Sequence, residues 1–176
     1  MNDLLMLAMM LGAPKYGYQL KQEVSWIMGQ QPLHNNVVYP LLRKFLEQKW
    51  VNKKEVPGER GQTRQQYALT TKGRRYLFER LNQFGEADAS SEGAFNLRVG
   101  LFPGLKPAVR ESILTLRENY LQGRDQKLRA LQGNMDLGKF GGEIVAHMHE
   151  QIKMELQWIL HLRRLVASSP IERRRR

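Results

Sequence analysis

The 176-residue sequence contains no cysteine, which excludes disulfides, thiolate nucleophiles and cysteine-ligated zinc. No apolar run approaches the roughly 18 residues that a membrane-spanning helix needs. The first residues, MNDLLMLAMMLG, include an aspartate and lack the basic segment of a signal peptide. We therefore expect a protein without a membrane segment that works in the reducing cytoplasm.

Patterns that would indicate an enzyme are also missing: a glycine-rich phosphate loop, a Ser-His-Asp arrangement and an acidic dyad. His147, His149 and Glu150, with Glu143 one turn earlier, suggest a metal site on a helix. However, His149 points away from the Glu143–His147 pair, and the His-Glu-x-x-His motif is absent. A solvated helix face is the simpler interpretation, and we expect no enzymatic activity, no metal and no cofactor.

Positive charge is concentrated in two parts of the chain. Residues 1–81 contain 13 Lys/Arg and 6 Asp/Glu, a net charge of +7, whereas residues 82–172 contain 11 of each. Arg173–Arg176 supply the remaining +4 of the total of +11. This asymmetry favours a first half that meets phosphate and a second half that meets another protein surface, although a merely basic protein is the alternative.

The most informative stretch, LHNNVVYPLLRKFLEQKWV, runs from Leu33 to Val51 and predicts a helix with one buried face. The apolar residues have the spacing of a core-facing helix: Val38, Leu41, Leu42, Phe45 and Leu46. Asn35 and Asn36 are good helix starters, and we expect Pro40 to lie in the opening turn. The outward positions combine amides, a hydroxyl and two cations: Asn36, Val37, Tyr39, Arg43 and Lys44.

Two strands are predicted directly after this helix, over Trp50–Glu55 and Thr63–Leu69. The intervening Pro57–Gly61 reads as a turn. In the second strand, alternation places Gln65, Tyr67 and Leu69 on one face and Arg64 and Gln66 on the other. Helix, strand, basic turn and strand, in that order, indicate a winged helix-turn-helix.

The run VVYPLLRKF, followed by ERGQTRQQYALTTKG, resembles the PadR family of bacterial transcriptional regulators. The matching features are Tyr39-Pro40 in the recognition helix, the Leu-Thr-x-x-Gly pattern at Leu69–Gly73 and the earlier Gly17-Tyr18. One position departs from the pattern, because Lys49 stands where the family usually places a glycine after the recognition helix. A left-handed residue there costs a non-glycine side chain on the order of 1 kcal/mol, so either that strain is accepted or the turn differs.

The rest of the first half reads as three further helices. Asn2–Leu11 predicts a short buried helix, and Tyr16-Gly17-Tyr18 starts a second one that ends near Gly29. We expect Leu20, Val24 and Ile27 to face inward there, and Trp26 and Met28 to be core or domain-contact residues. Thr70 is the predicted N-cap of a helix that carries Leu77, Leu81 and Phe84 on one face.

The second half has no strand signal. We expect a short helix over Ser91–Phe102, a long helix opened by Pro107, a glycine-rich turn over Gly133–Gly142 and a last helix over Glu143–Val166. A lone helical hairpin buries only one face of each helix, so this half needs a partner subunit. The layout is similar to the longer PadR-type proteins, including the AphA-like virulence activators, which dimerise through such a domain.

The predicted fold is thus mainly α, an α+β winged helix-turn-helix followed by an all-α helical-hairpin dimerisation domain. The expected domains are the DNA-binding domain (1–84), a linker (85–91), the dimerisation and effector domain (92–168) and a basic tail (169–176).

The resemblance implies a homodimeric, sequence-specific regulator of transcription, most often a repressor, on a pseudo-palindromic operator in double-stranded DNA. Such a protein would be cytoplasmic and nucleoid-associated. The expected DNA-binding residues are Asn35, Asn36, Val37, Tyr39, Arg43, Lys44, Arg60, Arg64 and Lys15. The alternatives are an effector-independent activator, or a helical interaction module whose winged helix binds a protein.

An effector site is a further hypothesis, since some PadR-type regulators respond to small aromatic molecules. The candidate residues, from the two long helices, are Tyr120, Met154, Trp158 and His161. A flat aromatic acid would place its ring against the indole and its polar end at His161 or Arg117. The competing interpretation is that these residues simply pack the core.

Overall fold

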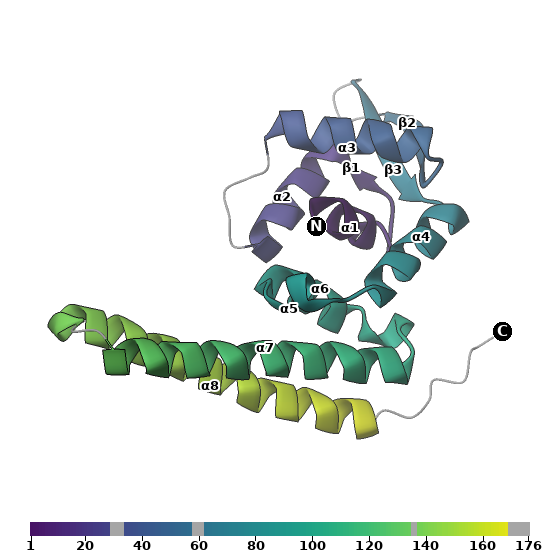
Figure 1. Ribbon diagram of the computed structural model, residues 1–176. Coiled ribbons are helices and arrows are strands. Elements are labelled where there is room, and N and C mark those ends of the chain that lie inside the picture. Colours follow the sequence, from purple (N-terminus) through teal and green to yellow (C-terminus); the bar gives the residue numbers. More distant parts are fainter. Residues whose placement is uncertain (29–33, 58–61, 135–136, 169–176) are drawn as a thin grey trace. The chain divides into compact units, whose positions relative to one another are not determined.

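The computed structural model describes residues 1–28, 34–57, 62–134 and 137–168. The chain divides into two compact units, residues 1–83 and 84–176, each with its own internal packing. Figure 1 shows the helices and strands in chain order. Among the described residues, no helix combines the length and the apolar content needed to cross a bilayer.

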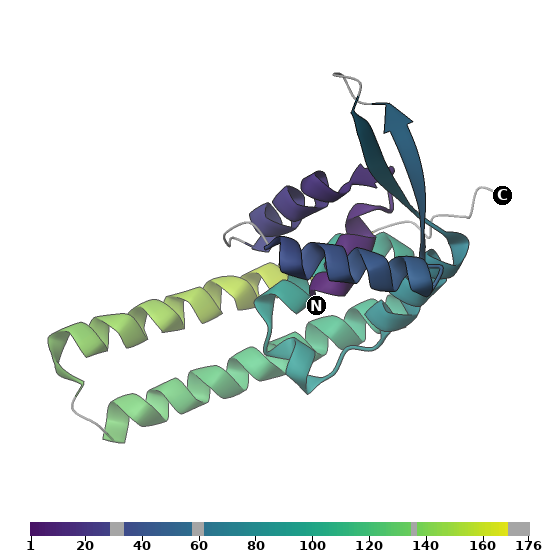
Figure 2. The same cartoon turned by 90° about the horizontal axis from the view of Figure 1, so that it is seen from above.

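The first unit is a winged helix, as predicted. Its elements are α1 (Asn2–Met9), β1 (Lys15–Tyr16), α2 (Gly17–Met28), α3 (Asn35–Glu47), β2 (Val51–Pro57), β3 (Thr63–Leu69) and α4 (Thr71–Asn82). The strands form an antiparallel sheet in the order β1-β3-β2, with Val51 opposite Leu69 and Pro57 opposite Thr63. Figure 2 shows β2 and β3 as one long pair of strands. The two-residue strand β1 was not predicted, because so short a segment carries no alternating pattern.

The core of this unit is formed by the inward faces of its helices. The fully buried side chains include Met6, Leu7, Leu20, Leu42, Phe45, Leu77 and Leu81. Helix α3 buries Val38, Leu42 and Phe45 as predicted, and Leu41 and Leu46 lie half-buried at the edge of the stripe. Since the core uses one face of α3, the opposite face is left to solvent.

The start of α3 differs from the prediction. The N-cap is His34, which makes no side-chain cap, so neither Asn35 nor Asn36 caps the helix. Pro40 is consequently the sixth helical residue and lies beyond the opening turn. There it removes an intrahelical hydrogen bond, because a proline has no N–H to donate to the carbonyl of Asn36. Both differences follow from a helix that begins at Asn35.

Helix α2 carries a second difference. Trp26 was expected to be a core or domain-contact residue, but its side chain is 74% exposed. Leu20 and Val24 do face inward. Because Trp26 follows Val24 by only two positions, the helical period turns it to a different face. Ile27 and Met28 lie outside the described side chains.

The Leu-Thr-x-x-Gly pattern fixes the junction between the strands and α4. Thr70 caps α4, accepting a hydrogen bond from the Gly73 N–H at 3.0 Å. The Thr70 hydroxyl lies 2.8 Å from the Lys49 carbonyl and 3.0 Å from that of Trp50. A Cβ on Gly73 would approach the Trp50 carbonyl oxygen to 2.0 Å, so only glycine fits there. The motif therefore fastens α4 to the end of α3.

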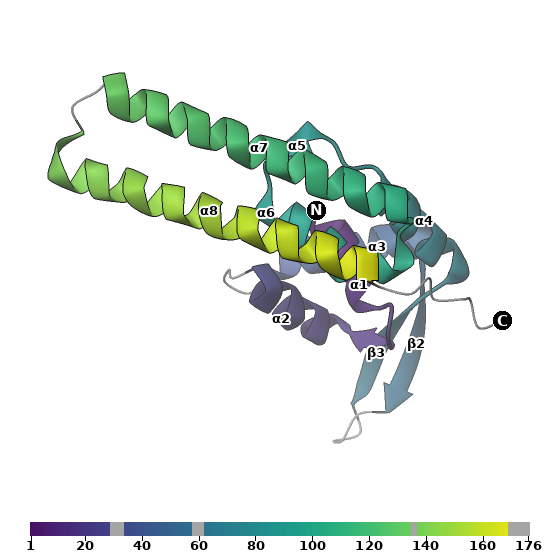
Figure 3. The same cartoon turned by 90° about the horizontal axis from the view of Figure 1, so that it is seen from below.

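The second unit is all-helical. Its elements are α5 (Glu86–Ala89), α6 (Glu92–Gly100), the 3-10 helix η1 (Phe102–Gly104), α7 (Pro107–Asn134) and α8 (Gly138–Ser168). Helices α7 and α8 run side by side as the predicted hairpin (Figure 3). Because α8 begins at Gly138, the turn is shorter than predicted, and Gly141 and Gly142 belong to the helix.

Residues 85–91, which we expected to be a linker, contain α5, and Ala89 is buried against α7. The buried Arg117 of α7 holds this segment. Its Nη1 donates to the Ala89 carbonyl at 2.6 Å, and its Nε and Nη2 donate to both carboxylate oxygens of Glu155, at 2.7 and 2.9 Å. The guanidinium lies over the rings of Phe95 and Tyr120. A small, acidic composition therefore does not by itself indicate a linker, because here the buried Arg117 donates a hydrogen bond to a carbonyl of the segment.

Candidate nucleic-acid interface

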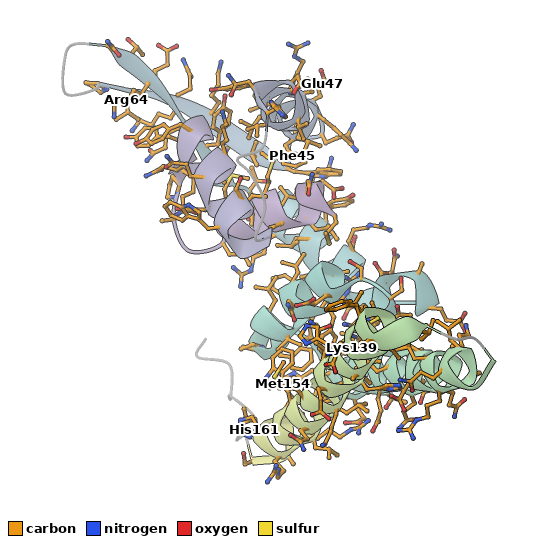
Figure 4. The ribbon with its side chains drawn as sticks, turned by 90° about the vertical axis from the view of Figure 1, so that its left-hand side faces the viewer. Phe45, Glu47, Arg64, Lys139, Met154 and His161 are labelled. Carbon is orange, nitrogen blue, oxygen red and sulfur yellow. The ribbon has the colours of Figure 1, made fainter. Side chains whose placement is uncertain are left out.

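The exposed face of α3 carries most of the predicted DNA-binding residues. Asn36, Arg43 and Lys44 are exposed, and the Tyr39 side chain is 48% exposed. Val37 is half-buried. In Figure 4, Phe45 lies on the inner side of this helix. The helix thus separates an apolar face that packs the unit from a polar face that bears two cations, two amides and a phenol.

Two predicted residues are engaged with neighbouring side chains. The Lys15 ammonium donates to the Glu23 carboxylate at 2.6 Å, which neutralises its charge. The Asn35 carbonyl oxygen accepts from Lys21 Nζ at 3.3 Å. Arg60 lies outside the described residues. Lys21 and the exposed strand lysines Lys53 and Lys54 were not among the predicted DNA-binding residues. Alternation along β2 could have indicated the two strand lysines, because neighbouring side chains of a strand point to opposite faces of the sheet.

The structure brings Tyr39 and Arg64 together in one hollow of about 540 Å³. Its walls come from the β1–α2 junction, α3 and β3, and are formed by Tyr16, Gly17, Tyr18, Tyr39, Arg64, Gln65 and Tyr67. We call this site the tyrosine hollow. Arg64 projects from the strand pair in Figure 4. Sequence reasoning missed Tyr16, Tyr18, Gln65 and Tyr67, because the pairing of β1 with β3 is what brings them to Tyr39.

Asn36 and Val37 line a different hollow, of about 700 Å³, together with Pro40, Leu41 and residues 1–3. Asp3 is its acidic group. Burial opposes ionisation of this carboxyl, but the Leu4 N–H bond at 2.9 Å, the terminal ammonium and Lys44 prevail and lower its pKa. An ionised Asp3 would repel a nearby phosphate, so this hollow is not suited to the DNA backbone.

The four predicted effector residues are distributed over different hollows of the second unit. Tyr120 lines a hollow of about 460 Å³ along α5 and α7, beside Arg124 and Lys127. Met154 and Trp158 line a hollow of about 890 Å³ along α6, α7 and α8. His161 is exposed and lines neither of these two. Met154 and His161 both project from α8 in Figure 4.

Arg117 is not free to receive a ligand carboxylate, because Glu155 and the Ala89 carbonyl occupy its donors. Trp158 makes an edge-to-face contact with the buried Phe95, with ring centroids 5.7 Å apart. Among the described residues, no group of His, Asp and Glu side chains is arranged to hold a metal ion.

Comparison with known proteins finds a family model that matches part of the chain. The family model described as the transcriptional regulator PadR-like family matches residues 6–79. Similar solved structures include a PadR family transcriptional regulator from Eggerthella lenta, with 30% identity, a TM-score of 0.39 and coverage of 44% of this chain and 65% of that one. Another is a PadR family transcription regulator from Clostridium difficile, with 20% identity, a TM-score of 0.40 and coverage of 45% of this chain and 81% of that one. Bacillus subtilis PadR in complex with operator DNA covers 93% of this chain and 98% of its own, with 16% identity and a TM-score of 0.47. No curated protein matches the sequence.

Proposed function

We propose that this chain, whose residues 6–79 match the model of the PadR-like transcriptional regulators, is such a regulator and binds double-stranded operator DNA sequence-specifically through α3. The observation that carries the proposal is the outward face of α3. Its amides supply both donors and acceptors for base edges, and Arg43 and Lys44 supply cations for phosphate. The exposed cations Lys53 and Lys54 of β2 and the half-buried Arg64 of β3 extend the positive surface onto the wing.

A homodimer is the second part of the proposal. Helix α8 carries an exposed stripe at alternating spacings of four and three residues: Phe140, Ile144, His147, Gln151, Met154, Trp158, His161 and Leu165. The Phe140 side chain is 80% exposed and that of Met154 is 66% exposed. A stripe with this period is the seam of a two-helix coiled coil, and a second copy of α8 would cover it. Two recognition helices would then reach adjacent major grooves about 34 Å apart on a pseudo-palindrome.

Repression follows from this arrangement if the operator overlaps a promoter, because the bound dimer excludes the polymerase. Release by a small effector would require that the effector bind the DNA-free form more tightly than the bound form. The hollows beside Tyr120 and Trp158 have volumes within the range of small-molecule sites. An effector-independent activator is the alternative, and the resemblance to the AphA-like activators favours it.

A second candidate function is suggested by Trp26. An exposed indole on α2 is typical of a protein-binding surface, so the winged helix could recognise a protein partner instead of DNA. The two functions differ in their chemistry: DNA binding depends on phosphate neutralisation and is weakened steeply by salt, whereas an indole-centred contact is not.

Selection of bound fragments from the source genome tests the proposal. The full-length protein is incubated with sheared genomic DNA, and the retained fragments are sequenced. A shared inverted repeat, with half-sites one helical turn apart, is the expected result. Retention of fragments without any common sequence would contradict sequence-specific binding, and retention of none would contradict DNA binding.

A further inference from the structure

We propose that the tyrosine hollow seats one phosphodiester group of the bound DNA, with Arg64 as its cation and tyrosine hydroxyls as additional donors. The inference rests on the proposed DNA-binding function and deepens it. It assigns a role to Tyr16 and Tyr18, which lie outside the recognition helix and the wing.

The charge of the hollow fits an anion. Arg64 is the only charged residue among the seven that line it, so the lining carries a net charge of +1. Among the described residues Arg64 makes no ion pair, in contrast to Lys15 on the neighbouring strand. A planar guanidinium can donate two parallel hydrogen bonds to the non-bridging oxygens of a phosphate.

The walls of the hollow are already ordered. The rings of Tyr16 and Tyr18 are stacked, with centroids 5.7 Å apart and planes 10° apart. The Tyr16 N–H donates to Gln19 Oε1 at 2.9 Å, which fixes the start of α2. Within the described part of the chain, none of the four tyrosine hydroxyls has a hydrogen-bond partner. Ordered phenols with available O–H groups can donate to phosphate oxygens, and their rings can pack against deoxyribose.

Gly17 sets the depth of the hollow. A Cβ at this position would lie 3.3 Å from Tyr39 Cε1 and 3.6 Å from the Tyr39 hydroxyl. The absence of a side chain at Gly17 therefore allows Tyr39 of α3 to pack against the β1–α2 junction, where both residues form one wall of the hollow.

Gln65 also lines the hollow, but its amide does not supply a donor to the phosphate. Its Nε2 donates to Glu55 Oε1 at 2.7 Å, whereas its Oε1 is buried and has no partner among the described residues. Phosphodiester oxygens only accept hydrogen bonds, so they cannot satisfy this acceptor.

The first experiment measures how the dissociation constant for duplex DNA depends on salt, using the full-length protein. Loss of one phosphate contact reduces the log–log slope by about 0.9, which is about a 3.5-fold smaller loss of affinity between 50 and 200 mM salt. We expect this change in Arg64→Gln for each subunit bound. Arg75→Gln, which removes an exposed cation of α4 outside the hollow, is the matched control and should leave the slope unchanged.

The second experiment locates the phosphate. Single phosphates of the duplex are replaced in turn by neutral methylphosphonate, and binding is measured for the wild type, Arg64→Gln and Tyr18→Phe. Tyr18→Phe removes one hydroxyl and should weaken binding to the normal duplex about 3- to 10-fold, as for a typical hydrogen bond. At one and the same position, methylphosphonate should weaken the wild type while leaving both variants little affected.

The outcomes distinguish failure of the phosphate site in the tyrosine hollow from failure of the proposed DNA-binding function. One outcome is that the wild type binds duplex DNA while Arg64→Gln and Tyr18→Phe lose sensitivity to methylphosphonate at different positions, or at none. That result would contradict the phosphate site in the tyrosine hollow and leave the DNA-binding function standing. If the wild type binds no duplex at all, the proposed function fails. Competition by inorganic phosphate at matched ionic strength would make the hollow a site for a free anion and overturn its assignment to DNA.

Discussion

At the scale of single residues, the end of α3 is the most strained point of the described backbone. Lys49 has a φ of 58°, in the left-handed region that favours glycine, and it is the only described non-glycine residue with a positive φ. The strain is accepted because three interactions hold the turn. The Trp50 N–H donates to the Phe45 carbonyl, the Lys49 N–H donates to the Leu46 carbonyl, and the Lys49 carbonyl accepts from Thr70.

Replacement of Lys49 by glycine should therefore stabilise the protein. Lys49→Gly should raise the free energy of unfolding by a few tenths to about 1 kcal/mol, because glycine adopts this conformation without a steric penalty. Gln48→Gly is the control, since Gln48 has a right-handed φ of −76° and glycine there should not stabilise. Denaturant titration of both variants measures the effect. A lower denaturation midpoint for Lys49→Gly would show that Lys49 makes an interaction that outweighs its strain.

Asp125 gives the hairpin of α7 and α8 a dependence on pH. Hydrogen bonds from Arg129 at 2.8 Å and from His149 Nδ1 at 2.5 Å, in that order, lower the pKa of this carboxyl. A lowered pKa means that Asp125 contributes stability above its unfolded pKa of about 3.9, and that this contribution is lost as pH falls through the folded value.

The wild type should consequently lose more stability between pH 5 and pH 3 than Asp125→Asn, in which the titrating group is absent. Urea midpoints at the two pH values provide the measurement. Equal losses in the two proteins would mean that the bonds to Arg129 and His149 contribute nothing to the stability of the native hairpin in solution.

At the scale of elements, the proposed pairing of two α8 helices predicts a register for the exposed stripe. If two copies of α8 pair antiparallel about their centre, the stripe pairs Phe140 with Leu165, Ile144 with His161, His147 with Trp158, and Gln151 with Met154. The flanking Glu143 and Arg164 then meet as opposite charges at both ends. A parallel pairing would separate Glu143 from Arg164, so these opposite charges favour the antiparallel register.

Charge exchange at the ends of the seam tests this register. Glu143→Arg and Arg164→Glu should each weaken the dimer, because each puts like charges opposite one another. The double variant should regain most of the lost affinity. Sedimentation equilibrium of the four full-length proteins gives the dimer dissociation constants. If the double variant is no better than the sum of the single ones, the two side chains do not meet and the helices pair differently.

The elements with a strong period were predictable, whereas the contacts between distant segments were not. The stripe of α3, the strand Thr63–Leu69 and the Thr70 cap follow from local spacing and local hydrogen bonds, and all three are present. Strand β1 and helix α5 are short, and their formation depends on pairing with β3 and on Arg117. The same dependence on distant contacts explains why the tyrosine hollow was not predicted. Helix α3 was recognisable from its own sequence, but the hollow forms only where the β1–α2 junction, α3 and β3 meet.

At the scale of the whole molecule, charge and exposed surface divide between the two units. The first 81 residues carry a net charge of +7 and present the polar face of α3, while residues 82–172 carry no net charge and present the exposed stripe of α8. Phosphate attraction by the first unit and the proposed self-association of the second would together suit a protein that holds two recognition helices on one duplex.

The central claim is that α3 binds DNA with its outward face, and the salt dependence of operator affinity tests it most directly. The full-length wild type should lose affinity linearly on a log–log plot, with a slope near −0.9 for each phosphate contact. Arg43→Ala and Lys44→Ala should each weaken binding to all sequences alike and make the slope shallower by about 0.9 for each subunit bound. Lys139→Ala, at the start of α8 (Figure 4), is the control and should change neither quantity. If both α3 variants bind with the slope and affinity of the wild type, α3 does not meet DNA with this face, and the account is contradicted.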